Sequence, residues 1–73
     1  MDTLLSMRVF RQVAEGGSFA DAARRMGLSA AMASKHVAHL ERHLGSRLLN
    51  RSSRHVSLTE AGARYYGRAR GIF

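Results

Sequence analysis

The stretch FADAARRMGLSAAMASKHVAHLERHLG, residues 19–45, predicts two helices joined by a short turn. Gly27 marks the end of the first helix, because glycine adopts the left-handed backbone conformation of a helix C-terminus at little cost. Leu28 supplies a hydrophobic plug in the turn, and Ser29 is a suitable N-cap for a second helix over residues 30–44. Two helices separated by a glycine-containing turn are typical of the helix-turn-helix.

The second helix of this stretch has two unlike faces when it is wound at about 100° per residue. Its apolar stripe, which we expect to be buried, consists of Ala33, Val37, Leu40 and Leu44. The opposite side and its flank carry mostly small and basic residues: Ala30, Ala31, Ser34, Lys35, Ala38 and Arg42. Alone, this face is equally consistent with a solvated helix surface and with a surface that reads base edges.

The residues before this stretch predict another helix. Residues 4–15 place apolar side chains at helical spacing: Leu4, Met7, Phe10, Val13 and Ala14. Gly16 and Gly17 end this helix. Ser18 stands three residues before Asp21, which is the spacing of a capping box, so the next helix should begin directly after Ser18.

After Gly45 the hydrophobic period changes to that of strands. Residues 48–51 and 55–58 predict two short strands, and residues 52–54 predict a polar turn between them. The result is a small hairpin whose tip is flanked by Arg51 and Arg54.

Thr59 is placed to cap a last helix, with Glu60 in the favourable first turn. The apolar side of this helix consists of Ala61, Tyr65, Tyr66, Ala69, Ile72 and Phe73. We expect so much apolar surface to need a covering partner. The apolar end of the chain also favours a fragment of a longer protein.

The composition points to a small domain with an anionic partner. A chain of 73 residues forms one domain, which buries only about 60% of the surface that its unfolded form exposes. The formal net charge is +7, and half of the basic residues but only one acidic residue follow position 44. All the basic residues except Lys35 are arginines, whose planar guanidinium matches phosphates and guanine edges. These features favour polyanion binding.

Several other classes of protein are disfavoured by the sequence. The absence of cysteine excludes disulfides and suits a reducing cytoplasm. No segment has the length of a membrane span or the layout of a signal peptide, so we expect a cytoplasmic protein. No pair of carboxylates, no nucleophile beside a base and no glycine-rich phosphate loop is evident, so we do not expect an enzyme.

Three histidines share one side of the helix over residues 30–44: His36, His39 and His43. Their spacing resembles that of a metal site, but no cysteine, carboxylate or fourth histidine is placed to complete the ligand shell. We therefore expect no metal. The same residues raise a second hypothesis, in which binding responds to pH near about 6, because an imidazole beside a phosphate gains a proton more readily.

The combined pattern over residues 4–66 resembles the DNA-binding domain of LysR-type transcriptional regulators. The residues that carry the resemblance are Ser18-Phe19, Ala22-Ala23, Leu28-Ser29, Ser34, Val37, Leu40-Glu41, Leu44-Gly45, Leu48-Leu49, Arg51, Val56, Leu58-Thr59 and Ala61-Gly62. The resemblance implies a mainly α fold, the winged helix-turn-helix, with a three-helix core, a two-stranded wing and a C-terminal linker helix. It places a DNA-binding domain at 1–58 and the start of the linker helix at 59–73.

The resemblance also implies partners. Members of the family bind double-stranded DNA at inverted-repeat operators as homodimers, which pair through the helix after the wing. That role falls here on Tyr65, Tyr66, Ala69, Ile72 and Phe73. A separate C-terminal domain, absent from this chain, normally binds a small effector, so no cofactor is expected in this domain.

The resemblance assigns the DNA contacts by position. Residues 30–38 would lie in the major groove, and Ser18 and Thr59 would touch phosphates near helix ends. Ser29 and Arg42, at the start and in the last turns of the recognition helix 30–44, are also expected to bind DNA. Arg51 and Arg54 of the wing would meet the backbone or the minor groove. This sequence departs from the common pattern in having Ala30 and Ala31 where many members have glutamine and proline or proline and serine, and Leu49 where phenylalanine is usual.

The alanines change where specificity is expected to lie. Their methyl groups can pack only on apolar atoms such as thymine methyls, whereas Lys35 suits guanine and Ser34 can donate or accept. Two other functions stay open from the residues alone. One is a protein-interaction module with the same shape, and the other is a nonspecific, nucleoid-like DNA binder.

Overall fold

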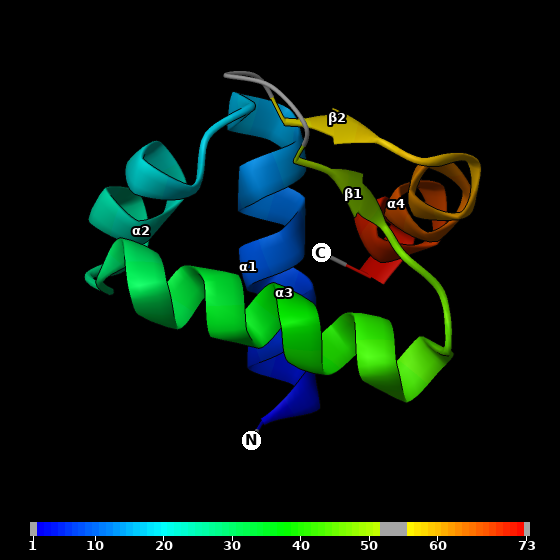
Figure 1. Ribbon diagram of the computed structural model, residues 1–73, viewed down its shortest axis with the longest axis horizontal. Coiled ribbons are helices and arrows are strands. Elements are labelled where there is room, and N and C mark those ends of the chain that lie inside the picture. The colour runs from blue at the N-terminus through cyan, green and yellow to red at the C-terminus, as the bar shows by residue number, and fades with distance from the viewer. Residues whose placement is uncertain (1, 52–55, 73) are drawn as a thin grey trace.

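The computed structural model describes residues 2–51 and 56–72, without the side chains of residues 69–72. The described elements are α1 (Thr3–Gly16), α2 (Phe19–Met26), α3 (Ala30–Leu44), β1 (Leu49–Asn50), β2 (Ser57–Leu58) and α4 (Glu60–Ile72). In Figure 1, α1 and α3 cross, α2 lies beside the beginning of α3, and the two strands lie between α1 and α4. The predicted mainly α fold with a two-stranded wing is confirmed.

The helix boundaries follow from local capping. The hydroxyl of Ser18 accepts from the backbone N–H of Asp21 at 3.3 Å, and that of Ser29 accepts from Met32 at 3.1 Å. Gly27 ends α2 with φ of 70°, in the left-handed region that favours glycine. Both predicted N-caps and the predicted glycine stop are therefore confirmed. One cap was not predicted: the carboxylate of Asp2 accepts from the first turn of α1.

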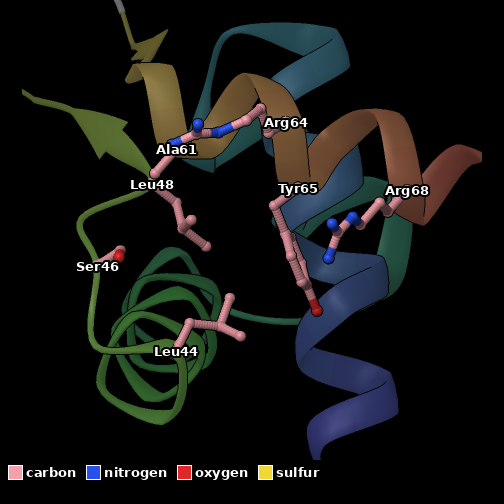
Figure 2. A pocket seen from close by; sticks show the side chains of 7 residues that line it. All are labelled: Leu44, Ser46, Leu48, Ala61, Arg64, Tyr65 and Arg68. Atoms are coloured by element: carbon pink, nitrogen blue, oxygen red, sulfur yellow. The ribbon is translucent and has the colours of Figure 1, made fainter.

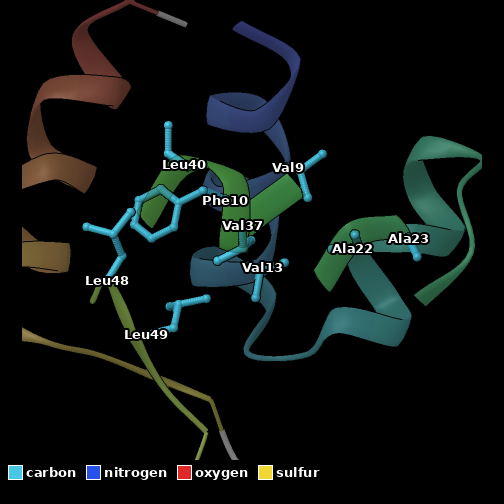
Figure 3. Packing of buried hydrophobic residues seen from close by; sticks show 10 residues of the cluster. Val9, Phe10, Val13, Ala22, Ala23, Val37, Leu40, Leu48 and Leu49 are labelled. Atoms are coloured by element: carbon cyan, nitrogen blue, oxygen red, sulfur yellow. The ribbon is translucent and has the colours of Figure 1, made fainter. Parts of the chain in front are cut away.

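The hydrophobic core lies where α1, α2, α3 and the start of β1 meet (Figure 3). Its fully buried residues are Val9, Phe10, Val13, Ala22, Ala23, Ala33, Val37, Leu40, Leu48 and Leu49. The two alanines of α2 leave space for the close approach of α3. Leu49, which stands where phenylalanine is usual in the resembling family, is 1% exposed and fills its place in the core.

Two residues of the predicted apolar stripes are exposed to solvent. Leu4 is 52% exposed, because it shares the outer face of α1 with Arg8 and Gln12. Leu44 is 39% exposed, because it lies in the last turn of α3, beyond the crossing with α1 (Figure 1). Val9 and Ser6, which the sequence pattern did not single out, are buried instead.

The wing is shorter than predicted. Its strands pair antiparallel with Leu49 opposite Leu58 and Asn50 opposite Ser57, so each strand has two residues in place of the four expected. The predicted turn over residues 52–54, with Arg54, lies outside the described residues.

The last helix is fixed to the rest of the domain at its beginning. The backbone N–H of Thr59 donates to the carbonyl of Leu48 at 3.0 Å, which continues the hairpin into α4. The hydroxyl of Thr59 accepts from the N–H of Gly62 at 2.9 Å, so its predicted capping role is confirmed. Gly62 lies so close to Leu48 that a Cβ atom there would stand 2.0 Å from the Leu48 carbonyl oxygen. The wing and α4 are therefore packed backbone against backbone.

Candidate nucleic-acid interface

The outer face of α3 is open to solvent. Ala30, Ala31, Lys35 and Arg42 are exposed, and Ser34 and Ala38 are half-buried at the edge of the same face. The N-terminal half of this face therefore carries short side chains and one cation. A groove wall or another flat surface could approach the α3 backbone closely there.

The hydroxyl groups that the sequence predicts as DNA contacts differ in whether their hydrogen already donates a bond within the chain. Ser18 and Ser29 accept backbone N–H bonds as caps, so each keeps its hydroxyl hydrogen available to an outside acceptor. The hydroxyl of Thr59 donates to the carbonyl of Arg47 at 2.6 Å while it caps α4. Its hydrogen is committed within the chain, so a phosphate contact at Thr59 would have to replace this bond or use the backbone.

Arg51 lies directly after β1 and reaches back to α3. Its Nη1 atom donates to Ser34 Oγ at 3.2 Å, and its Nη2 atom lies 3.5 Å from Glu41 Oε1. The guanidinium carbon lies 4.7 Å from the centre of the Phe19 ring, in the geometry of a cation–π contact. The sequence predicts Arg51 as a wing cation for the DNA backbone, whereas the structure gives its guanidinium three partners within the chain.

Glu41 is a functional candidate that sequence reasoning missed. While Oε1 faces Arg51, Oε2 accepts from the backbone N–H groups of Leu48 at 2.8 Å and Leu49 at 3.3 Å. This carboxylate therefore ties α3 to the first strand of the wing. Its partners lie seven and eight residues further along the chain, after α3 has ended, so the helical period of α3 does not reveal the contact.

A second basic position comes together beside the end of α3. The exposed side chains of Arg42 and Arg47 line one shallow hollow with Ala38, Glu41, Gly45 and Ser46. Arg42 was singled out in the sequence, but Arg47 was not, because it follows the helix and shares no periodicity with it. Together they place two guanidinium groups at one edge of the α3 face.

The residues predicted for dimerisation lie partly against their own chain. The Tyr65 ring packs against Phe10 with 5.7 Å between ring centroids, and its partial burial raises the pKa of its phenol. The Tyr66 hydroxyl donates to Glu15 at 2.9 Å. The side chains of Ala69 and Ile72, and all of Phe73, lie outside the described residues.

A hollow of about 330 Å³ remains open between the end of α3 and α4 (Figure 2). Its apolar floor is formed by Leu44, Leu48, Ala61 and Tyr65, and its polar lining by Ser46, Arg64 and Arg68. The unburied surface of Leu44 faces this hollow. Figure 2 shows the Leu44 and Leu48 side chains from one wall and Tyr65 from the other.

The three histidines of α3 have separate environments. His36 is 4% exposed, and its Nδ1 atom lies 2.9 Å from the hydroxyl of Ser6 in α1. His39 Nε2 lies 3.3 Å from the Thr3 hydroxyl, and the His39 and His43 rings stack with 6.3 Å between centroids. Partial burial, followed by nearby positive charges, lowers the pKa of His39 below 6.5. Over the described residues, no three metal-binding side chains gather in one place.

The three-helix core, the short antiparallel wing and the exposed face of α3 define a winged helix-turn-helix domain. The model of a known protein family, the bacterial regulatory helix-turn-helix proteins of the lysR family, matches residues 4–63. The chain belongs to this family. In the described part of the chain, no helix is both long and apolar enough to cross a membrane.

The similar proteins are transcriptional regulators. An uncharacterized HTH-type transcriptional regulator from Haemophilus influenzae is 49% identical over 72 residues, which cover 99% of this chain and 25% of that protein. An HTH-type transcriptional repressor from Pseudomonas aeruginosa is 48% identical over 66 residues, covering 90% of this chain and 21% of that protein. The chain thus spans about a quarter or less of the length of these curated relatives.

The fold is also close to that of a solved complex. The crystal structure of the BenM DNA-binding domain with catB site 1 DNA superimposes with a TM-score of 0.92 at 35% sequence identity. The match covers 99% of this chain and 79% of that chain. The predicted winged helix-turn-helix architecture is confirmed by this likeness.

Proposed function

We propose that this domain binds double-stranded DNA sequence-specifically as part of a transcriptional regulator, with α3 in the major groove. The observation that carries the proposal is the exposed face of α3, which presents short side chains and cations on a fold similar to a domain solved with DNA. The major groove of B-DNA, about 12 Å wide, admits one α-helix. We assign base contacts to residues 30–38.

The side chains of this face divide by chemistry. Lys35 is long and exposed, and its ammonium group suits the two acceptors of guanine. Ala30 and Ala31 offer only methyl groups, which pack on thymine methyls and let the helix lie deep in the groove.

The edges of the face supply phosphate contacts. Arg42 and Arg47 share one hollow beside the end of α3, so both can meet the DNA backbone along that edge. Ser18 and Ser29 stand at the N-termini of α2 and α3, where backbone N–H groups and the helix dipole attract anions. For Arg54 of the wing, we retain the sequence prediction of a contact with the DNA backbone or the minor groove.

A second copy of the chain completes the proposed binding unit. A dimer would place two α3 helices about 34 Å apart, one helical turn of DNA, and would therefore match an inverted-repeat operator. The C-terminal helix with Tyr65 and Tyr66 is the proposed contact, and the open hollow beside it leaves Leu44 for a partner to cover.

Other properties follow from the same proposal. A regulator of this kind acts in the cytoplasm, carries out no catalysis in this domain and needs no cofactor here. An effector site would belong to the part of a longer protein that the chain does not cover, since the curated relatives are about four times as long.

Footprinting on a pool of DNA fragments tests the proposal against its alternatives. A discrete protected inverted repeat supports sequence-specific binding. Uniform retention of all fragments would instead identify a nonspecific, nucleoid-like binder. Absence of retention at low salt would leave a protein-interaction module, because electrostatic binding to DNA is strongest under that condition.

A further inference from the structure

We propose that Arg51 positions Ser34 as a hydrogen-bond donor toward a base, which makes the pair a specificity determinant. The inference rests on the DNA-binding function proposed above. Ser34 and Arg51 are seventeen residues apart in the chain, yet the guanidinium donates to the serine hydroxyl oxygen at 3.2 Å. Arg51 therefore acts from the wing on a side chain of the recognition face.

The direction of this hydrogen bond decides what Ser34 can offer. A guanidinium has only donors, so Ser34 Oγ must accept in its bond with Arg51. A serine hydroxyl has one hydrogen, which is then left to point away from Arg51. The positive charge of the guanidinium also polarises the hydroxyl and strengthens it as a donor. Without Arg51, the same hydroxyl could donate or accept equally well.

Arg51 is itself held in place from two further sides. Glu41 Oε1 lies 3.5 Å from Nη2, and the Phe19 ring lies 4.7 Å from the guanidinium carbon. Glu41 is fixed in turn by the backbone N–H groups of Leu48 and Leu49. The side chains of Arg51 and Glu41 are 36% and 18% exposed, so the arrangement lies at the edge of the surface.

The neighbouring residues favour a base over a phosphate as the acceptor for Ser34. Ser34 follows Ala30 and Ala31 by one helical turn, and their short side chains allow a close approach of α3 to base edges. Guanine N7 and O6, adenine N7 and thymine O4 are the acceptors in the major groove. A cytosine amino group would meet the fixed donor of Ser34 with another donor. The pair should therefore disfavour cytosine at one position of each half-site.

Binding to every single-base-pair variant of the duplex that the wild-type chain selects from a random pool tests this inference. Ser34→Ala should flatten the preference at one base pair per half-site by roughly 3–10-fold, as expected for one net hydrogen bond. Arg51→Lys keeps the charge but loses the planar fork, so it should flatten the preference at the same base pair. The double variant, which combines Ser34→Ala with Arg51→Lys, should lose no more base preference than Ser34→Ala alone. The control, Arg8→Lys on the outer face of α1, should keep the full preference.

Three results would overturn the inference. Equal weakening of all sequences by Ser34→Ala would place the hydroxyl on a phosphate. If Arg51→Gln weakened binding to all DNA sequences equally and Arg51→Lys had no effect, Arg51 would be a phosphate contact. Full base preference in Arg51→Lys, with the preference lost in Ser34→Ala, would show that Ser34 needs no positioning. Absence of any retention of DNA by the wild-type chain would instead reject the proposed function itself.

A measurement without DNA separates positioning from folding. In the free wild-type chain, the NMR signals of the Arg51 guanidinium should show restricted rotation. Ser34→Ala should make this rotation faster while the melting temperature stays the same. Unchanged Arg51 signals in Ser34→Ala would contradict the contact directly. Arg51→Gln serves as the second variant if Arg51→Lys does not fold.

Discussion

At the scale of single residues, Ser6 and His36 form a polar contact inside the core, between α1 and α3. Both are buried, with exposed fractions of 0% and 4%. The Ser6 hydroxyl donates to the Asp2 carbonyl at 3.0 Å, so it accepts from His36 Nδ1 at 2.9 Å. His36 therefore carries a hydrogen on Nδ1 in this arrangement.

Ser6→Ala should destabilise the domain. It leaves the buried Nδ1–H of His36 without its partner, which costs about 1–3 kcal/mol of unfolding free energy. Urea unfolding of the wild-type chain and of Ser6→Ala measures the difference in unfolding free energy. Ser57→Ala, at an exposed position, is the matched control and should change stability by less than about 0.5 kcal/mol. Equal stability of the two variants would show that the buried contact is dispensable.

His39 should make stability depend on pH. Its pKa in the folded chain lies below 6.5, because partial burial and nearby positive charges disfavour the imidazolium. The unfolded chain then binds this proton more readily, so stability falls as pH drops through about 6.5. His39→Gln removes this contribution, and its melting temperature should fall less between about pH 7.5 and 5.5. An identical fall in both proteins would rule out this role of His39.

The sequence predicts the roles of residues whose partners lie within a few positions along the chain. It does not predict the roles of residues whose partners lie far along the chain. Ser29 and Ser18 announce helix starts because a cap bonds within three residues. By contrast, Ser6 meets His36 thirty residues away, and Ser34 meets Arg51 seventeen residues away. Periodicity also cannot show where a neighbouring helix ends its contact, which explains the exposed Leu44.

At the scale of elements, the wing is joined to α3 on one side and to α4 on the other. The Glu41 carboxylate accepts from the Leu48 backbone N–H just before β1, and the Leu48 carbonyl accepts from the backbone N–H of Thr59 just before α4. The periodicity of the sequence predicts the existence of each element. It gives strands that are too long, because pairing in a small hairpin depends on the geometry of both strands together.

Gly62→Ala tests the docking of α4 on the wing. Alanine should stabilise a free helix by up to about 1 kcal/mol relative to glycine. Here its Cβ would stand 2.0 Å from the Leu48 carbonyl oxygen, so the two backbones must separate and stability should fall. Thermal unfolding measures the change. The control is Gly67→Ala in the same helix, where an added Cβ would meet nothing within 4 Å beyond its chain neighbours and the backbone of its own helix, so stability should rise. A stabilised Gly62→Ala would contradict the close packing.

At the scale of the whole molecule, positive charge and short side chains meet on one surface. The chain carries a formal net charge of +7, and Lys35, Arg42 and Arg47 are exposed along α3 and directly after it. The sequence indicates the charge and the helix face. It does not show that Arg47 joins Arg42, since only the fold brings the end of α3 and the next loop to one hollow.

Arg42→Gln should weaken binding to all DNA sequences by a similar factor. A phosphate contact carries no base information, and removing one should lower the slope of log affinity against log salt by about 1. Titrations of selected and unrelated duplexes at several salt concentrations measure both effects. Weakening confined to the selected duplex would instead place Arg42 on a base.

The central claim is that the small-residue face of α3 docks closely in the major groove. Affinity of the Ala31→Leu variant for the selected duplex tests it most directly. Ala31 is exposed and leucine favours helices, so the melting temperature should be unchanged. The larger side chain should lower affinity by roughly tenfold or more, as expected for overpacking at a close contact. Unchanged affinity in a folded variant would mean that α3 does not dock there.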